Sequence, residues 1–293
     1  MPLFSRGYAL YLNDNNKWWV TGNNDIIHWV DELAGIMELK ESEPDGLSRL
    51  IFTAMSNDNK SSISEYFNAD DPEWLCHDQK TLRIWRNDNV PDVICEVNNE
   101  YVSETRYINM WYSLTPIYWR NIQYGGLPFH SALAELDGYG VLIAASGNTG
   151  KSTCCRRLPD YWKPLCDDES LIVLNTERYF AHPFPTWSNY LWKNSGSTWD
   201  VQYSVPIRAI FFLEQSKTDE VIPLRMGESA SYINESSVQV CHKFLHNIDK
   251  ESKIRLITAI FNNACEIAKN IPAFRLCASL HGNFWEEIEK VIR

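Results

Sequence analysis

Apolar and polar residues alternate in short runs along the first 110 residues, which is the pattern of half-buried strands. Turn-forming residues separate two pairs of such runs, and we predict strands at 8–12, 18–20, 81–85 and 93–97. Apolar positions with helical spacing predict a helix over 26–39, and the run 47–55 predicts a second, short helix. Residues 1–110 are therefore expected to form a smaller, strand-rich α+β domain that recognises a partner or regulates the rest of the chain.

After residue 110 the apolar runs lengthen, and predicted strands mix with predicted helices. The predicted strands lie at 129–136, 141–145, 171–174, 207–214, 221–224 and, as an edge strand, 274–278. The predicted helices lie at 110–119, 152–158, 228–245, 250–268 and 285–292. Asp137-Gly138 is a tight turn, so a hairpin comes directly before the segment that follows residue 145. This pattern predicts an α/β domain over residues 111–293 with helices near its C-terminus.

Composition narrows the classes of function. Apolar residues make up 44% of the chain, enough for a core, and the net charge is −11 with a pI near 5.1. An acidic protein is a poor partner for nucleic acid and for anionic membranes, which attract basic surfaces. No apolar run approaches the ~20 residues that span a bilayer, and the first residues lack an apolar signal segment, so we expect a cytoplasmic protein. The eight cysteines include no Cys-x-x-Cys pair and are expected to be reduced and mostly buried.

The clearest chemical signal follows the apolar run that ends at Ala145. Small residues come next, and Gly150-Lys151-Ser152-Thr153 opens a predicted helix. This order of strand, loop and helix start predicts a phosphate-binding loop, whose backbone N–H groups surround phosphate oxygens while the lysine contacts the β- and γ-phosphates. The predicted nucleotide-binding residues are Ser146, Gly147, Asn148, Thr149, Gly150, Lys151, Ser152 and Thr153. ATP and Mg²⁺ are the expected ligands, with the Ser152 hydroxyl on the metal.

Two adjacent carboxylates, Asp167 and Asp168, follow the loop at the boundary of a predicted strand. In phosphoryl transfer, one acid binds Mg²⁺ and another accepts the proton of the attacking hydroxyl. We predict that Asp168 and Ser152 bind the metal and that Asp167 is the base. Lys151 is predicted to be a catalytic residue as well. Alternatively, Asp167 and Asp168 exchange these roles.

These pieces occur in the order found in a known family. A histidine on a strand, His130, precedes the loop with Lys151, and the Asp167-Asp168 pair follows, which resembles the HPr kinase/phosphorylase family. The runs 150–159, 165–169 and 182–188 are similar to those of a divergent branch, the HPr-kinase-like proteins of the SynChlorMet cassette. The resemblance covers roughly residues 125–280 and implies an HPr-kinase-like P-loop domain with a mixed sheet. It also implies that His130 lies next to Asp167 and tunes its proton affinity.

The resemblance implies an ATP-dependent kinase that phosphorylates a Ser or Thr hydroxyl of a peptide or protein, such as a ribosomally made peptide precursor. Peptide-modifying enzymes are the implied partners, and a homo-oligomer is the implied assembly. Two alternatives remain at this point: a nucleotide-binding scaffold that regulates a partner enzyme, and a P-loop kinase of a small molecule. Ala145 favours the scaffold alternative, because the usual phosphate-binding loop has glycine at this position.

Overall fold

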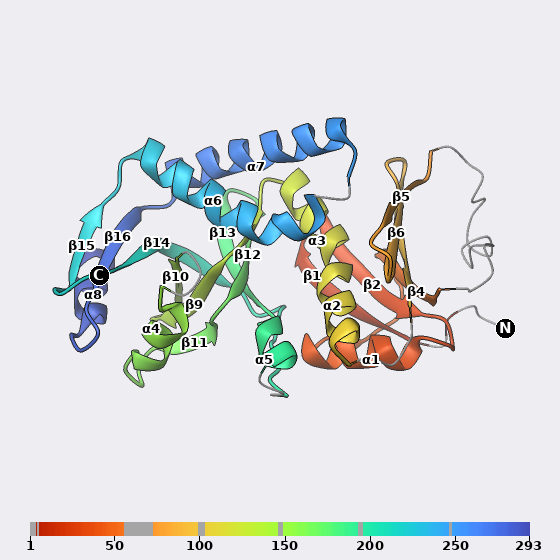
Figure 1. The fold of residues 1–293 in the computed structure, drawn as a ribbon, viewed down its shortest axis with the longest axis horizontal. Helices are drawn as coiled ribbons and strands as arrows, with labels where there is room; N and C mark the ends of the chain where they lie inside the picture. Colours follow the sequence, from red (N-terminus) through yellow and green to blue (C-terminus); the bar gives the residue numbers. More distant parts are fainter. Residues whose placement is uncertain are drawn as a thin grey trace. The chain divides into compact units, whose positions relative to one another are not determined.

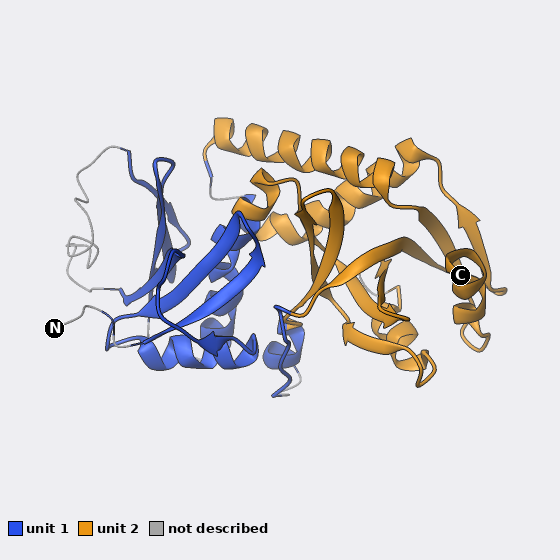
Figure 2. Ribbon diagram, turned by 180° about the vertical axis from the view of Figure 1, so that it is seen from behind, with its two compact units in different colours: residues 1–119, 187–202, 244–248 blue, residues 120–186, 203–243, 249–293 orange. Residues whose placement is uncertain are grey.

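The computed structural model describes residue 4 and residues 6–55, 73–98, 103–145, 149–192, 196–245 and 248–293. The chain divides into two compact units (Figure 2). The first contains residues 1–119, 187–202 and 244–248, and the second contains residues 120–186, 203–243 and 249–293. The predicted boundary between residues 110 and 111 falls inside the helix α2 (Ser103–Ser113), and the functional division of the chain there stays a prediction.

The first unit is built on a seven-stranded mixed sheet with the order β3-β1-β2-β4-β7-β6-β5 (Figure 1). Its strands are β1 (Gly7–Asn13), β2 (Asn16–Gly22), β3 (Lys40–Glu41), β4 (Ser48–Ala54), β5 (Leu75–Asp78), β6 (Leu82–Asn87) and β7 (Val90–Val97). The four predicted strand runs are confirmed as β1, β2, β6 and β7. The helix predicted over 26–39 is confirmed as α1 (Ile27–Ile36), and α5 (Trp187–Trp192) joins α2 in this unit.

The short helix predicted over 47–55 is wrong, because these residues form β4. This strand pairs in parallel with β2 on one side and β7 on the other. Leu50, Ile51 and Phe52 are all at most 3% exposed, so successive side chains on both faces of the strand are covered. A strand buried on both faces is a continuous apolar run, which periodicity alone does not distinguish from a helix segment.

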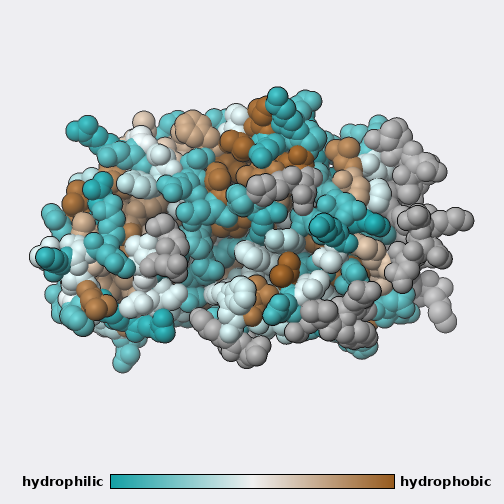
Figure 3. All heavy atoms as spheres, in the orientation of Figure 1, coloured by the Kyte–Doolittle hydropathy of each residue, from teal (hydrophilic) through white to brown (hydrophobic). Residues whose placement is uncertain are grey.

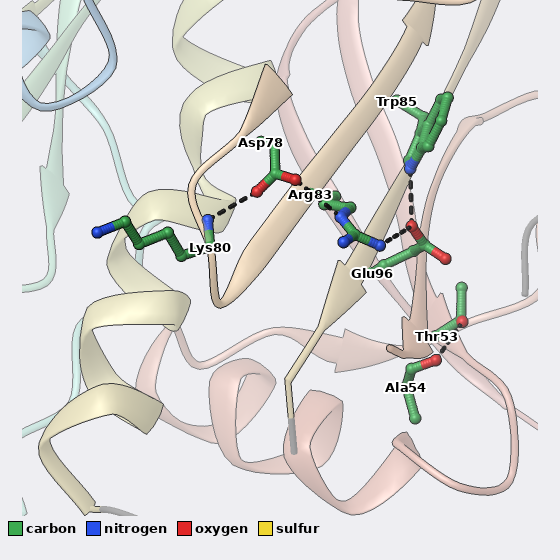
Figure 4. A network of polar contacts seen from close by, with 7 residues as sticks. All are labelled: Thr53, Ala54, Asp78, Lys80, Arg83, Trp85 and Glu96. Carbon is green, nitrogen blue, oxygen red and sulfur yellow. Dashed lines mark hydrogen bonds and ion pairs between the residues drawn. The ribbon is translucent and has the colours of Figure 1, made fainter. Parts of the chain in front are cut away.

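A polar network around one buried carboxylate ties β5, β6 and β7 together (Figure 4). The Glu96 side chain is fully buried and accepts a hydrogen bond of 2.9 Å from Trp85 Nε1. Arg83 lies 3.9 Å from the same carboxylate and donates through Nε to Asp78 at 3.0 Å. Asp78 in turn accepts from the backbone N–H of Lys80 at 2.7 Å. The network therefore supplies partners for a carboxylate that would be costly to bury alone.

The second unit contains a nine-stranded sheet. Seven strands have the order β11-β9-β10-β14-β13-β12-β8, and the other two are β16, which pairs with β14, and β15, which pairs with β16. The strands are β8 (Leu127–Phe129), β9 (Ser131–Leu136), β10 (Tyr139–Ala144), β11 (Lys163–Cys166), β12 (Glu169–Asn175), β13 (Arg178–Phe184), β14 (Val205–Gln215), β15 (Glu220–Pro223) and β16 (Ala273–Ala278). The predicted hairpin is confirmed, because β9 and β10 pair antiparallel from Leu136–Tyr139 to Ser131–Ala144. The edge strand predicted at 274–278 is wrong in its position, because β16 lies between β14 and β15.

The parallel strands β10, β14 and β16 bring three loops to one edge of this sheet. Parallel strands end at the same edge, and ligand sites of open α/β sheets lie beyond the carboxyl ends of such strands. The segment predicted to bind phosphate leaves β10 at this edge. Two other connections, after Gln215 and after Ala278, leave from it as well.

Besides α1, α2 and α5, the structure describes α3 (Thr115–Gln123), α4 (Lys151–Arg157), α6 (Met226–Leu245), α7 (Lys250–Asn270) and α8 (Phe284–Ile292). The helix predicted at 110–119 is thus two helices, α2 and α3. The predicted C-terminal helices are confirmed as α6, α7 and α8. The architecture is mixed α/β with two mixed sheets.

Helices cover both faces of the sheet in the second unit. On one face, Cys154 and Cys155 of α4 and Phe284 of α8 join a core cluster with Phe211 of β14. On the opposite face, Phe212 stacks on Tyr232 of α6 with ring centroids 5.0 Å apart. The alternation of Phe211 and Phe212 between faces follows from the two-residue period of a strand.

Helix α7 buries only part of its apolar surface. Ile260 is buried, whereas Ile254, Ile257 and Phe261 are 57%, 39% and 50% exposed. The brown region near the top of Figure 3 lies over this helix. The helix predicted over 250–268 is therefore confirmed, but several of its apolar side chains do not face the core.

Candidate functional site

A glycine in the left-handed region ends the described part of the segment between β10 and α4. Gly150 has φ +112° and ψ 20°, and α4 begins with the next residue. Among the described residues, its chain neighbours apart, no atom lies within 4 Å of where a Cβ on Gly150 would be, so the backbone angle is what favours glycine there. Thr149, Lys151, Ser152 and Thr153 are described, and the predicted residues Ser146, Gly147 and Asn148 lie outside the described residues.

Lys151 is held at the start of α4 by two acceptors. Its side chain is folded back, so that Nζ donates to the carbonyl of Ala145 at 3.0 Å and contacts Nε2 of His130. The residue is only 7% exposed, and this burial lowers the pKa of Lys151. The nearby carboxylates of Asp168 and Asp167 act in the opposite direction and favour the charged ammonium. A cation is thus placed between the loop and the acidic pair.

His130 joins this lysine to the acids. It lies between β8 and β9, its backbone N–H donates to the Ser236 carbonyl at 3.2 Å, and its Nδ1 is 3.6 Å from Oδ1 of Asp168. Burial, and then the charge of Lys151, lower the pKa of His130 to about 4. The imidazole is therefore neutral at pH 7. An ammonium can only donate, so Nε2 accepts from Lys151 and the ring proton is on Nδ1, facing Asp168.

The two aspartates have different surroundings at the junction of β11 and β12. Asp167 accepts a hydrogen bond of 2.7 Å from the Thr186 hydroxyl, which is buried. Asp168 has a side chain 40% exposed and lies against His130. His130 was expected next to Asp167, and the contact that the structure shows is with the adjacent acid, Asp168. The two acids are presented by the same junction but held by different groups.

Three residues near the site were not found by sequence reasoning. Gln215, at the end of β14, donates through Nε2 to the carbonyl of Thr149 at 3.1 Å, and Thr186 holds Asp167. Lys243 on α6 forms an ion pair with Glu169. Thr186 lies two residues after the end of β13, within the run 182–188 that carries part of the resemblance. Gln215 follows from strand order, because β14 is the parallel neighbour of β10. Lys243 carries no signal in the sequence.

The described residues fit a magnesium ion held mainly by a nucleotide. No group of three or more His, Cys, Asp and Glu side chains that could hold a metal occurs within the described ranges. Mg²⁺ commonly uses one or two carboxylates together with phosphate oxygens and water, and does not need such a cage. Ser152 at the start of α4 and the half-exposed Asp168 are the donors that this arrangement would use.

One comparison with known proteins gives a match. The family model described as SynChlorMet cassette protein ScmC matches residues 93–293, which include every residue of the site above. A search of the curated proteins finds no match. Among the helices that the structure describes, none is both long enough and apolar enough to cross a membrane.

Proposed function

The chain belongs to the SynChlorMet cassette protein ScmC family, and we propose that it is an ATP-dependent, HPr-kinase-like kinase of a Ser or Thr hydroxyl. One observation carries this proposal: a buried lysine that follows a left-handed glycine shares a single polar network with an acidic pair. Nζ of Lys151 contacts Nε2 of His130, Nδ1 of His130 lies 3.6 Å from Oδ1 of Asp168, and Asp167 is the adjacent residue. This is the combination of phosphate-binding cation, metal ligand and base that phosphoryl transfer requires.

In the proposed reaction, the substrate hydroxyl oxygen forms a bond to the γ-phosphorus of ATP. The bond from that phosphorus to the β,γ-bridging oxygen breaks, ADP leaves, and the hydroxyl proton passes to the carboxylate of Asp167. Magnesium, when bound through Ser152 and Asp168, neutralises charge on the phosphate oxygens. Positioning and charge neutralisation supply most of the rate in such transfers, so little covalent chemistry is asked of the protein.

Lys151 has a separate role in the proposal. Without nucleotide its ammonium donates to Ala145 and contacts neutral His130. Phosphate oxygens carry negative charge, so an ammonium is attracted to them more strongly than to an uncharged carbonyl. The lysine would therefore turn from the carbonyl to the β- and γ-phosphates. Neutral His130 adds no positive charge that would compete with this interaction.

The proposed substrate is a peptide or protein, and we favour a ribosomally made peptide precursor. Membership of a cassette family and the resemblance of residues 150–159 and 165–169 to HPr-kinase-like proteins support this class. Peptide-modifying enzymes encoded beside the gene are the proposed partners, and a homo-oligomer and a cytoplasmic setting are proposed with them.

The test uses purified protein with labelled ATP, Mg²⁺ and the peptides encoded beside its gene. Label should appear on a Ser or Thr of one peptide. Lys151→Ala should abolish transfer and weaken nucleotide binding. Asp167→Asn should lower transfer by about 10²–10⁴-fold, the usual contribution of a general base, while calorimetry still detects nucleotide binding. Asp160→Asn, an exposed acid in the same unit, is the matched control and should retain wild-type transfer.

Other results would favour a different function or refute part or all of the proposal. Nucleotide binding without transfer to any neighbouring peptide would favour a scaffold that regulates a partner enzyme. Transfer to a small hydroxylated metabolite, but to no peptide, would favour a small-molecule kinase. If Asp167→Asn transfers phosphate at the wild-type rate, the base assignment is wrong. If the wild-type protein binds neither Mg-ATP nor Mg-GTP, the whole proposal fails.

A further inference from the structure

One stripe of α6 touches both sides of the candidate site. Ser236, Val240 and Lys243 are spaced i, i+4 and i+7, so they lie on one face of the helix, about 10 Å from end to end. The Ser236 carbonyl accepts the backbone N–H of His130 at 3.2 Å. Two turns later, Nζ of Lys243 lies 3.6 Å from Oε2 of Glu169. The same helix face thus supports the histidine and the acidic segment.

The Lys243–Glu169 pair is buried on both sides. Each side chain is only 6% exposed. Burial lowers the pKa of Lys243 to about 8, and the negative charge of Glu169 opposes that change most strongly. Removing one member of a buried pair leaves an uncompensated charge, which is strongly destabilising. Neither side chain can therefore move away without the other.

The position of Glu169 connects this pair to the proposed chemistry. Glu169 is the first residue of β12 and follows Asp167 and Asp168 directly. Asp167 and Asp168 lie in the bend between β11 and β12, so an anchor at Glu169 fixes the end of the strand to which that bend is joined. An anchor at residue 169 thus limits the movement of both aspartates.

We propose that Lys243 is a positioning residue, which acts through Glu169 to hold the β11–β12 junction so that Asp167 and Asp168 face the phosphate loop. Lys243 does not contact the reacting atoms in this proposal. The expected effect of Lys243 on the rate of phosphate transfer rests on the proposed kinase function. Its effect on the position of the β11–β12 junction does not depend on that function.

The test compares Lys243→Met with a double variant, Lys243→Met with Glu169→Gln. The single variant leaves a buried carboxylate without its cation and is expected to lower the melting temperature. The double variant removes both charges, so its melting temperature should return close to that of the wild type. Lys269→Met removes the cation of an exposed ion pair on α7 and is the matched control.

Two readouts separate positioning from stability. The first is steady-state phosphorylation, where the double variant should keep a kcat about 10- to 100-fold below wild type with little change in KM for ATP, as expected for a small misplacement of catalytic groups. The second is hydrogen–deuterium exchange at residues 166–170, which needs neither nucleotide nor peptide. Exchange at these amides should be faster in the double variant than in the wild type and in Lys269→Met.

The outcomes distinguish this inference from the proposed function. If the double variant has wild-type kcat or wild-type exchange at residues 166–170, Lys243 is not a positioning residue. If the wild-type protein transfers no phosphate, the kinase proposal fails, and the exchange measurement still decides whether Lys243 anchors the junction.

Discussion

The lowered pKa of His130 should make the folded protein less stable as the pH falls, and His130→Gln should remove that effect. The imidazole is held by burial and by Lys151 at a pKa of about 4, against an ordinary value of 6.5. Above pH 6.5 it is neutral in both the folded and the unfolded chain. Between pH 6.5 and 4 the unfolded chain takes up a proton that the folded chain does not. Stability is therefore lost progressively over this window, and the loss is complete below pH 4.

The size of this effect follows from the difference between the two pKa values. A difference of one pKa unit corresponds to 1.36 kcal/mol, so the His130 contribution is about 3 kcal/mol. That is a large fraction of the stability of an ordinary domain. In His130→Gln the amide oxygen can still accept from Lys151, but no proton is taken up in this range. The two proteins should thus differ little in their pH dependence above pH 7 and by about 3 kcal/mol near pH 4.

Two measurements check this prediction. Urea denaturation between pH 7 and 4 gives the free energy of unfolding for the wild type, for His130→Gln and for His28→Gln, whose exposed imidazole makes it the control for the loss of a histidine. Nuclear magnetic resonance of labelled histidine gives the titration directly, and the resonance missing from His130→Gln should have a midpoint near pH 4. Parallel stability curves, or a His130 midpoint near 6.5, would refute the arrangement of His130 beside Lys151.

Two further changes test the backbone of the loop and the network of the first unit. Gly150→Ala should cost about 1–3 kcal/mol of stability and weaken Mg-ATP binding in calorimetry, because φ is +112° there. A variant with unchanged stability and affinity would show that the loop does not need this angle. Glu96→Ala should cost about 1–3 kcal/mol in urea denaturation, because Trp85 Nε1 loses its buried acceptor, and Glu96→Gln should cost less, because its amide oxygen can replace that acceptor. Equal costs for the two variants would contradict this reading of the network.

Strand pairing decided the state of β4 and the position of β16, whereas the hairpin of β9 and β10 has a local signal. The hairpin before the loop was predictable, because Asp137-Gly138 marks its turn and the flanking runs are apolar. The run 47–55 was not, since β4 owes its burial to β2 and β7, which lie far from it in sequence. The same holds for β16, whose place between β14 and β15 depends on two partners rather than on its own residues. The local sequence shows whether a segment is apolar. Its pairing with other strands decides whether it forms a strand and where that strand lies in the sheet.

The candidate site divides in the same way. Lys151 and the acidic pair carry local signals, a strand before a glycine-lysine turn and two adjacent carboxylates, and the structure joins them through His130. His130 was expected next to Asp167, and the structure shows its imidazole 3.6 Å from the carboxylate of the adjacent residue, Asp168, in the same bend.

The sequence by itself determined the apolar runs, the order of strand, glycine-lysine turn and helix, and the position of the two acids, since each depends on residues within a few positions of one another. Tertiary structure alone decided that Thr186 holds Asp167, that Gln215 meets the loop and that Lys243 pairs with Glu169. These contacts join residues 19, 66 and 74 positions apart. Over such separations no local periodicity relates the partners, and only the packing of strands and helices brings them within reach.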